Sequence, residues 1–234
     1  MNTAQELGLT KLTVKLFEPM YVDFDRQLSN ALLRRDAFLD RMIAHEIPYL
    51  HEDLQGKSLS NEANRYISHC LKGLGGKKTL PLKTVSISVR HETAESLRSV
   101  VREHNLVRDA FLNRLIALLR SSENLLDALG LPSRIRWNRI DNTEDPTISP
   151  LRNIADTLND PLFYLRAACE KQYGCGLYLL EFPVELMGLS CYLDDDRVPG
   201  TTSYSERIKE TSILFGELDS FESNLTSTKA NKEA

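Results

Sequence analysis

The chain has 234 residues, of which 41% are hydrophobic, and a net charge of −4. This length suits one or two soluble domains with a buried core. No apolar run is long enough to span a membrane, and the N-terminal residues lack the pattern of a signal peptide. We therefore expect a cytoplasmic protein without a membrane partner.

The charge is unevenly distributed along the chain. Residues 1–121 contain 18 Lys and Arg against 14 Asp and Glu, whereas residues 122–234 contain 11 against 19. The first half is therefore net +4 and the second net −8, which favours a nucleic-acid-contacting part joined to a part with another role.

Residues 10–45 predict a strand followed by two helices. Apolar and polar residues alternate from position 11 to 16, a period typical of a half-buried strand. Pro19 suits the first turn of a helix. The apolar residues that follow have helical spacing: Phe24, Leu28, Phe38, Leu39, Met42 and Ile43.

Residues 46–82 predict a helical linker. "SNEANRYISHCLKGL" is typical of a helix that ends at Gly73, and "GLGGKK" favours a flexible link with solvated Lys77 and Lys78. The glycine spacing does not match a phosphate-binding loop.

Residues 83–121 repeat the pattern of the first unit. Val85, Ile87 and Val89 alternate with polar residues, Thr93 is a plausible helix N-cap, and the helical pattern breaks at Asn105. "RDAFLDRMIA" from Arg35 recurs as "RDAFLNRLIA" 73 residues later, and the apolar positions upstream stay in register. This indicates a duplicated unit.

A lone strand leaves its backbone groups unpaired, so each unit needs a partner. The simplest partner is the other copy, with its strand antiparallel to the first. The fold class expected is therefore α+β and mainly helical: a two-stranded ribbon with four helices behind it. The copies either pair within one chain or swap between two chains.

The two units resemble the ribbon-helix-helix superfamily of DNA-binding proteins, of the MetJ and Arc type. The resemblance implies that the ribbon enters the major groove and that its outward side chains read base edges. Those side chains are Lys11, Thr13, Lys15, Thr84, Ser86 and Ser88. It also implies a phosphate contact where each second helix begins, at Arg34, Arg35, Val107 and Arg108.

Two features depart from the family pattern. The turn position where the family favours Gly holds Leu32 in one copy and Asn105 in the other. The residue after the shared Arg is acidic in both, Asp36 and Asp109. A carboxylate there favours the helix dipole but repels a DNA phosphate, so we expect a weak or displaced phosphate contact.

Residues 122–222 predict an α/β extension for oligomerisation or protein contacts. "NLLDALGLP" indicates a helix with a glycine stop, two helical pieces meet at Asp160–Pro161, and "LYLLEFPVELMGLSCYL" favours one or two strands interrupted by Pro183. The arginines at 134, 136 and 139 around Trp137 suggest a basic patch. Residues 223–234 are small and polar, which predicts a disordered tail.

We find no catalytic or cofactor motif in the sequence. The five histidines are scattered, His45 and His51 favour a helix surface over a ligand role, and the aspartates at 194–196 favour a solvated turn over a metal site. The four cysteines lack paired metal-ligand spacing and predict reduced thiols. We expect neither enzyme activity nor a cofactor.

The function expected is that of a sequence-specific transcriptional regulator. Duplicated forms resemble regulators of plasmid conjugation, which implies an activator of transfer genes and association with a nucleoid or plasmid. The partners expected are double-stranded DNA and further copies of the chain in a homodimer or higher oligomer. The alternative is an antitoxin-type or relaxosome protein that binds DNA through the repeat and a protein partner through its acidic C-terminal half.

Overall fold

The computed structural model describes residues 8–75, 80–133 and 158–213. The chain divides into two compact units, Met1–Tyr192 and Leu193–Ala234, called unit 1 and unit 2. Four sequence predictions lie wholly or mostly outside the described residues: the linker lysines at 77 and 78, the arginines around Trp137, the helical piece that precedes Asp160, and the tail 223–234.

The described part is α+β and mainly helical, with one two-stranded antiparallel sheet. Its elements in unit 1 are β1 (Leu9–Phe17), α2 (Glu18–Asn30), α3 (Arg35–Asp53), α4 (Asn61–Gly75), β2 (Leu82–Arg90), α5 (His91–Glu103), α6 (Arg108–Arg120), α7 (Glu123–Ala128), α10 (Phe163–Tyr173) and the 3₁₀ helix η1 (Val184–Leu189). Unit 2 contains the 3₁₀ helix η2 (Asp195–Arg197) and a helical segment over 202–213. None of the helices that the structure describes has the length and apolar content needed to cross a membrane.

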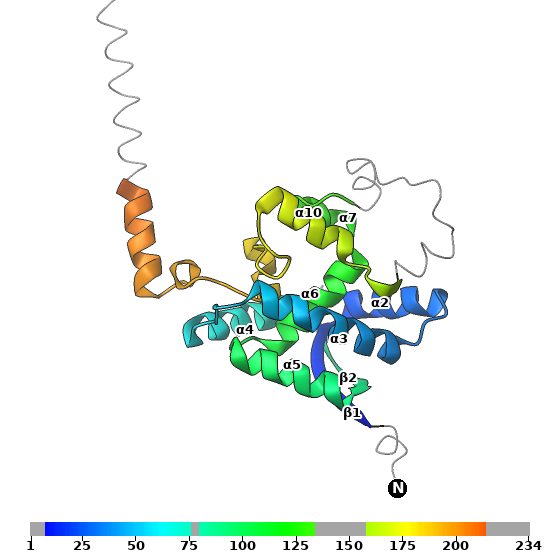
Figure 1. Cartoon of the computed structure of the whole chain (residues 1–234). Helices are drawn as coiled ribbons and strands as arrows, with labels where there is room; N and C mark the ends of the chain where they lie inside the picture. The colour runs from blue at the N-terminus through cyan, green and yellow to red at the C-terminus, as the bar shows by residue number, and fades with distance from the viewer. Residues whose placement is uncertain (1–7, 76–79, 134–157, 214–234) are drawn as a thin grey trace, which may run out of the picture. The chain divides into compact units, whose positions relative to one another are not determined.

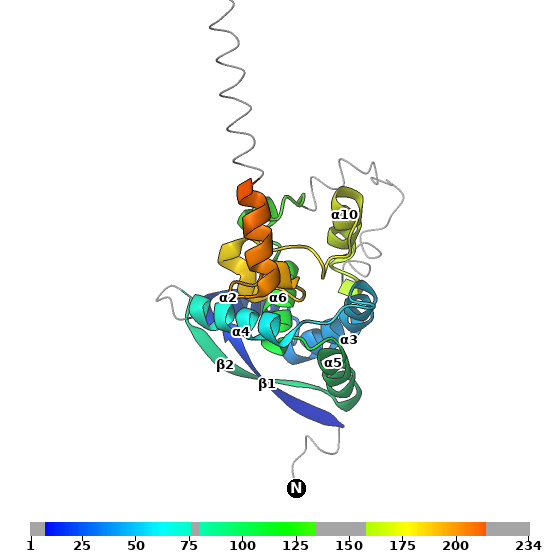
Figure 2. The same cartoon turned by 90° about the vertical axis from the view of Figure 1, so that its left-hand side faces the viewer.

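The two strands form a ribbon within one chain. β1 and β2 are antiparallel, with Thr13 opposite Ser86 at the centre, which confirms the predicted pairing. One face of the ribbon is buried against helices of unit 1 (Figure 2). Its inward residues are Leu12, Val14, Leu16, Val85, Ile87 and Val89. This alternation follows from the period of two in a strand.

Each strand passes directly into a helix. The amide of Glu18 donates to the carbonyl of Pro81 at 2.8 Å, and the amide of His91 donates to that of Gly8 at 2.9 Å. These bonds to the residue just before the opposite strand satisfy the first amide of each helix, and α5 begins at His91. The predicted N-cap role of Thr93 is therefore wrong: Thr93 lies inside α5 and is buried. Pro19 lies in the first turn of α2, as predicted.

Linker helix α4 runs to Gly75, two residues past the predicted stop at Gly73. Gly73 does not adopt the left-handed conformation in which a glycine commonly ends a helix. The glycine stop after α7 is confirmed, since Gly130 has a φ of 64°. The break around Asp160–Pro161 is followed by α10, whose C-cap is Gly174.

The segment 177–193 contains no strand, so the predicted strands there are wrong. It packs on α4 and α6 as irregular chain and η1. A Cβ atom at Gly188 would lie 2.6 Å from the backbone nitrogen of Leu71, so the two segments are in close contact. Segment 177–193 can be buried without forming a sheet because a side chain from α6 donates hydrogen bonds to several of the segment's backbone carbonyls.

That side chain is Arg114, which is fully buried. Its guanidinium donates to the carbonyls of Leu177 and Leu180, the latter at 3.0 Å, and lies 3.5 Å from that of Leu189. It also stacks over the ring of Phe182, 4.2 Å from the centroid. A buried backbone acceptor needs a donor, and here one arginine replaces the ladder of a sheet.

A second buried polar group joins α3 to α10. The Glu46 carboxylate accepts hydrogen bonds from Arg166 at 2.8 and 2.9 Å and from the Tyr178 hydroxyl at 2.8 Å. Burial raises the pKa of Glu46, and the Arg166 guanidinium opposes that rise. Because unpaired buried charges are costly, this group fixes how α10 packs on α3.

Candidate nucleic-acid interface

The outward face of the ribbon is polar and solvent-exposed. Of the six predicted base-reading residues, five are exposed and Ser88 is half-buried. The strand register places them in three opposed pairs: Lys11 with Ser88, Thr13 with Ser86, and Lys15 with Thr84. The structure therefore brings all six together on one surface, and the two cationic members of the six both lie on β1.

The register gives the ribbon an approximate two-fold symmetry. Thr13 and Ser86 are 73 residues apart, occupy equivalent places in the two copies, and face each other at the centre. The symmetry relates backbones but not chemistry, because one strand presents Lys-Thr-Lys and the other Thr-Ser-Ser.

The second helix of each copy holds the outer edge of the opposite strand. Asp36 of α3 accepts from the amide of Ser88 at 3.0 Å, and Asp109 of α6 accepts from the amide of Lys15 at 3.2 Å. These carboxylates, which departed from the family pattern, thus satisfy strand-edge amides. An unpaired edge is a template for aggregation, so the two aspartates also protect the ribbon.

One turn further along, the same helices make a second pair of edge contacts. Asp40 accepts from the amide of Arg90 at 2.9 Å. Asn113 accepts from the amide of Phe17 at 3.0 Å and donates to the carbonyl of Lys15 at 2.8 Å. Asp40 and Asn113 are equivalent positions of the repeat, so the ribbon is held symmetrically on both edges.

The predicted phosphate-contacting arginines contact the ribbon. The Arg108 guanidinium donates to the carbonyl of Thr13 at 2.6 Å and pairs with Asp109 at 3.0 Å. Arg35 pairs with Asp36 at 2.6 Å, with its guanidinium 3.5 Å from the carbonyl of Ser86. Both arginines therefore lie at the rim of the outward face, with their orientation fixed by strand carbonyls.

The other two predicted phosphate residues, Arg34 and Val107, are the N-caps of α3 and α6. Neither helix has a side-chain hydrogen bond at its N-cap. Arg34 is exposed and Val107 is half-buried. Uncapped first-turn amides, with the positive end of the helix dipole, suit an anion.

A basic cleft of about 510 Å³ lies on the α6 side of the ribbon. Its charged lining consists of Lys15, Lys72, Arg98, Arg102, Arg108 and Asp109. Lys72, Arg98 and Arg102 were not among the predicted site residues. Arg98 and Arg102 are four residues apart on α5, a spacing that places them on one face. At the equivalent positions of the first copy stand Asp25 and Ser29, so this pair of arginines is specific to the second copy.

The turn between the two helices has the same backbone in both copies. Leu32 and Asn105, at equivalent positions, have φ values of 58° and 52°. The amides of Leu33 and Leu106 close the turns on the carbonyls of Leu28 and Val101, each at 2.9 Å, as in a Schellman motif. The left-handed position is therefore kept even where the residue is a leucine.

We expect Leu32→Gly to stabilise the protein. The left-handed conformation costs a non-glycine residue about 1–2 kcal/mol, and the Leu32 side chain is 93% exposed, so it contributes little packing. Part of the gain is lost to the greater freedom of glycine in the unfolded chain, which leaves about 0.5–1 kcal/mol. The measurement is the urea midpoint.

The control is Ala31→Gly, one residue earlier, where φ is −83°. Glycine relieves no backbone strain at that φ, so this variant should be as stable as wild type or less stable. A Leu32→Gly protein no more stable than wild type would contradict the strain assigned to this turn.

Comparison of the chain with protein-family models, with curated proteins and with solved structures found no match.

Proposed function

We propose that the chain is a ribbon-helix-helix type DNA-binding regulator that reads the major groove of double-stranded DNA with the outward face of its ribbon. The observation that carries the proposal is the division of the ribbon into a buried apolar face and a polar face that is exposed except at the half-buried Ser88. The major groove is about 12 Å wide and admits a two-stranded ribbon. A ribbon with a solvated polar face, secured at both edges, is a rigid surface for such a contact.

The chemistry of the outward face supports base reading. Lys11 and Lys15 supply donors that match guanine O6 and N7, while hydroxyls donate or accept. Because the two lysines among the six predicted base-reading residues both lie on β1, the two halves of the ribbon would prefer different base sequences. A ribbon completed within one chain thus suits an asymmetric site.

Phosphate contacts would flank the ribbon. The uncapped first turns of α3 and α6 offer backbone amides, and the basic cleft adds Lys72, Arg98 and Arg102 on one side. Since Asp36 and Asp109 bond to strand amides, part of their charge is neutralised locally. We propose stronger phosphate contact on the α6 side than on the α3 side.

Within this proposal the protein acts on transcription in the cytoplasm, at a nucleoid or plasmid, as an activator of conjugative transfer genes. The regulatory role and the plasmid setting rest on the resemblance of the duplicated units to conjugation regulators. Further copies of the chain in a dimer or higher oligomer would occupy neighbouring sites and raise their effective concentration. Binding sites located at promoters would support this role, whereas sites confined to one origin would favour a relaxosome protein.

Lys15→Ala is expected to weaken binding to a DNA sequence selected from a random pool. Loss of a good base contact costs about 1–3 kcal/mol, which is roughly a tenfold to hundredfold rise in Kd. Lys15 is exposed on the ribbon, so the fold should be unchanged. The measurement is a mobility shift on the selected sequence and on scrambled DNA.

The matched control is Lys171→Ala, which removes the same charge from α10, on the opposite side of unit 1 from the ribbon (Figure 1). It should bind as wild type does. Equal weakening by Lys15→Ala on selected and scrambled DNA would assign Lys15 to phosphate instead. Unchanged affinity would contradict its role.

A further inference from the structure

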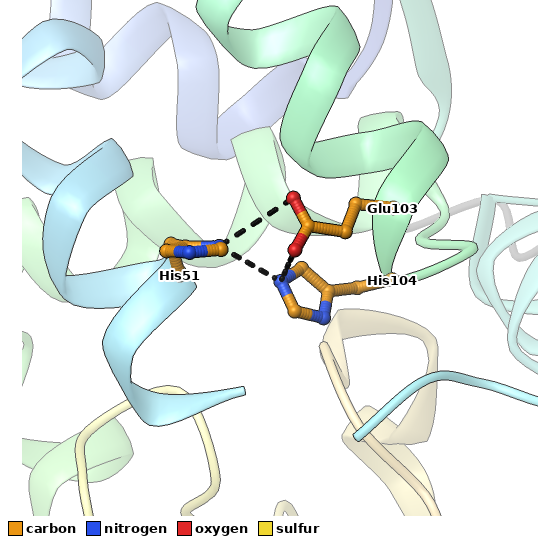
Figure 3. A group of neighbouring side chains, drawn as sticks. All are labelled: His51, Glu103 and His104. Atoms are coloured by element: carbon orange, nitrogen blue, oxygen red, sulfur yellow. Dashed lines mark hydrogen bonds and ion pairs between the residues drawn. The ribbon is translucent and has the colours of Figure 1, made fainter. Parts of the chain in front are cut away.

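Three side chains that are separated in the sequence converge at the junction of the two copies. His51 comes from the last turn of α3, Glu103 is the last residue of α5, and His104 follows it. Figure 3 shows the two imidazoles and the carboxylate pointing toward one another. The His51 Nδ1 lies 3.2 Å from the His104 Nε2 and 3.6 Å from a Glu103 oxygen, while the other Glu103 oxygen lies 4.0 Å from His104 Nε2.

A backbone carbonyl fixes the orientation of His104. The His104 Nδ1 lies 2.7 Å from the carbonyl oxygen of Lys57, and its side chain is buried. A carbonyl only accepts hydrogen bonds, so Nδ1 carries the hydrogen and Nε2 keeps its lone pair. That lone pair faces His51 and Glu103. Metal-bound histidines in proteins commonly donate their second ring N–H to a carbonyl in this way.

We propose that His51, Glu103 and His104 bind a divalent transition-metal ion of the Zn²⁺ class. In a tetrahedral site with bonds of about 2.0–2.1 Å, ligand atoms are roughly 3.3 Å apart. The 3.2 Å between the two imidazole nitrogens matches that edge. One Glu103 oxygen lies within 4.8 Å of both nitrogens, so the exposed carboxylate would move inward to complete the site. The side chains of His51 and Glu103 are half-exposed, which provides an entry path and leaves a fourth position for water.

Such an ion would join the two copies of the repeat. α3 belongs to the first copy and α5 to the second, and the segment that carries Lys57 leads from α3 to α4. One ion would therefore hold the end of α3, the end of α5 and the start of the linker together. Metal binding that favours the folded chain over the unfolded one raises stability.

The described residues contain one other group of this type, and it is occupied by an arginine. In the cluster of His45, Glu46 and Asp160 the Arg166 guanidinium bonds to both carboxylates. It already neutralises the negative charge that would attract a metal ion. Among the described residues, the trio His51–Glu103–His104 is therefore the stronger candidate.

The trio could also be explained without a metal ion, by a hydrogen bond in which His51 Nδ1–H donates to His104 Nε2. The two explanations differ in what removal of His51 does to metal affinity. The test uses the full-length chain freed of metal with a chelator and titrated with Zn²⁺ against a chromogenic competitor. Co²⁺ absorption then reports the geometry and the ligand atoms.

We expect one Zn²⁺ per chain, with visible Co²⁺ bands typical of tetrahedral nitrogen and oxygen ligation. His51→Ala should lower Zn²⁺ affinity at least about 100-fold, because loss of a direct ligand should cost at least as much as loss of an outer partner. Glu103→Ala should lower it as well. Both side chains are half-exposed, so both variants should stay folded by circular dichroism, and Zn²⁺ should raise the Tm of wild type but not of His51→Ala.

His69→Ala is the matched control, because it removes an exposed histidine from α4 and should leave Zn²⁺ affinity unchanged. No stoichiometric Zn²⁺ or Co²⁺ binding by the folded wild type would overturn the proposal. So would wild-type affinity in His51→Ala. Near-ultraviolet cobalt–thiolate bands would assign the ion to cysteines, such as Cys169 and Cys175 with sulfurs 3.9 Å apart, and would equally reject the trio.

Discussion

Ile87→Asp should unfold the chain, whereas Ser86→Asp, one residue away, should fold normally and bind DNA more weakly. Ile87 is fully buried and Ser86 is exposed, since neighbours on a strand point to opposite faces. Loss of the isoleucine packing costs about 2–5 kcal/mol, and burial of a polar group without a partner adds roughly 2–7 kcal/mol. That sum rivals the whole stability of about 5–15 kcal/mol of a typical domain.

Ser86→Asp places a carboxylate at the centre of the outward face. Binding to DNA should weaken at least tenfold, because a lost base contact costs about 1–3 kcal/mol and the new charge repels phosphate. Thermal unfolding followed by circular dichroism measures the first effect and a mobility shift measures the second. The reverse pattern, with Ser86→Asp unfolded and Ile87→Asp folded, would mean that the faces of the ribbon are assigned the wrong way round.

Arg114→Ala should be among the most destabilising substitutions in the chain, at about 3–5 kcal/mol. Its guanidinium satisfies buried carbonyls of segment 177–193, and each unsatisfied group costs roughly 1–3 kcal/mol. The alanine also leaves a cavity. Arg114→Met keeps most of the volume, so the two variants together separate the lost hydrogen bonds from the lost packing. Urea unfolding provides the measurement.

The repeat supplies the control for this prediction. Arg41 occupies the equivalent position of the first copy, yet it is exposed and bonds to Asn159. Arg41→Ala should change stability by no more than about 0.5 kcal/mol. Similar losses for the two arginines would contradict the role assigned to Arg114.

The ribbon could be predicted from the sequence because its signal is local. Alternation from Lys11 to Leu16 and from Thr84 to Val89 fixes which residues face inward, and the repeat then supplies a partner for each strand. The turn between the two helices of each copy could also be predicted from the sequence. Asn105 tolerates a positive φ, and the register of the repeat assigns the same turn to Leu32.

The parts that sequence reasoning missed depend on contacts between distant segments. Asp36 and Asp109 follow the local rule for a first helical turn, but their bonds to strand amides are set by the tertiary fold. Arg41 and Arg114 lie in nearly identical decapeptides. They differ in burial because segment 177–193 packs over Arg114 and not over Arg41. The strand prediction for that segment was wrong because a short apolar run with a central proline does not distinguish a strand from other buried chain.

The trio His51–Glu103–His104, at the ends of α3 and α5, could not be predicted from the sequence for the same reason. His51 and His104 are 53 residues apart and match no metal-binding motif. Only the packing of α3 against α5 brings them together. Scattered histidines in a sequence therefore do not argue against a shared site when they lie near helix ends.

The most direct test of the central proposal is to identify which peptides of the wild-type chain touch DNA. The full-length protein would be crosslinked by ultraviolet light to a bromodeoxyuridine-containing DNA selected from a random pool, and the crosslinked peptides identified by mass spectrometry. We predict crosslinks in the two strands, at Lys11–Lys15 and Thr84–Ser88, with weaker ones near Arg98 and Arg102 of the basic cleft. Crosslinks confined to other surfaces, or a folded chain that selects no DNA at low salt, would contradict the proposal that the ribbon reads DNA.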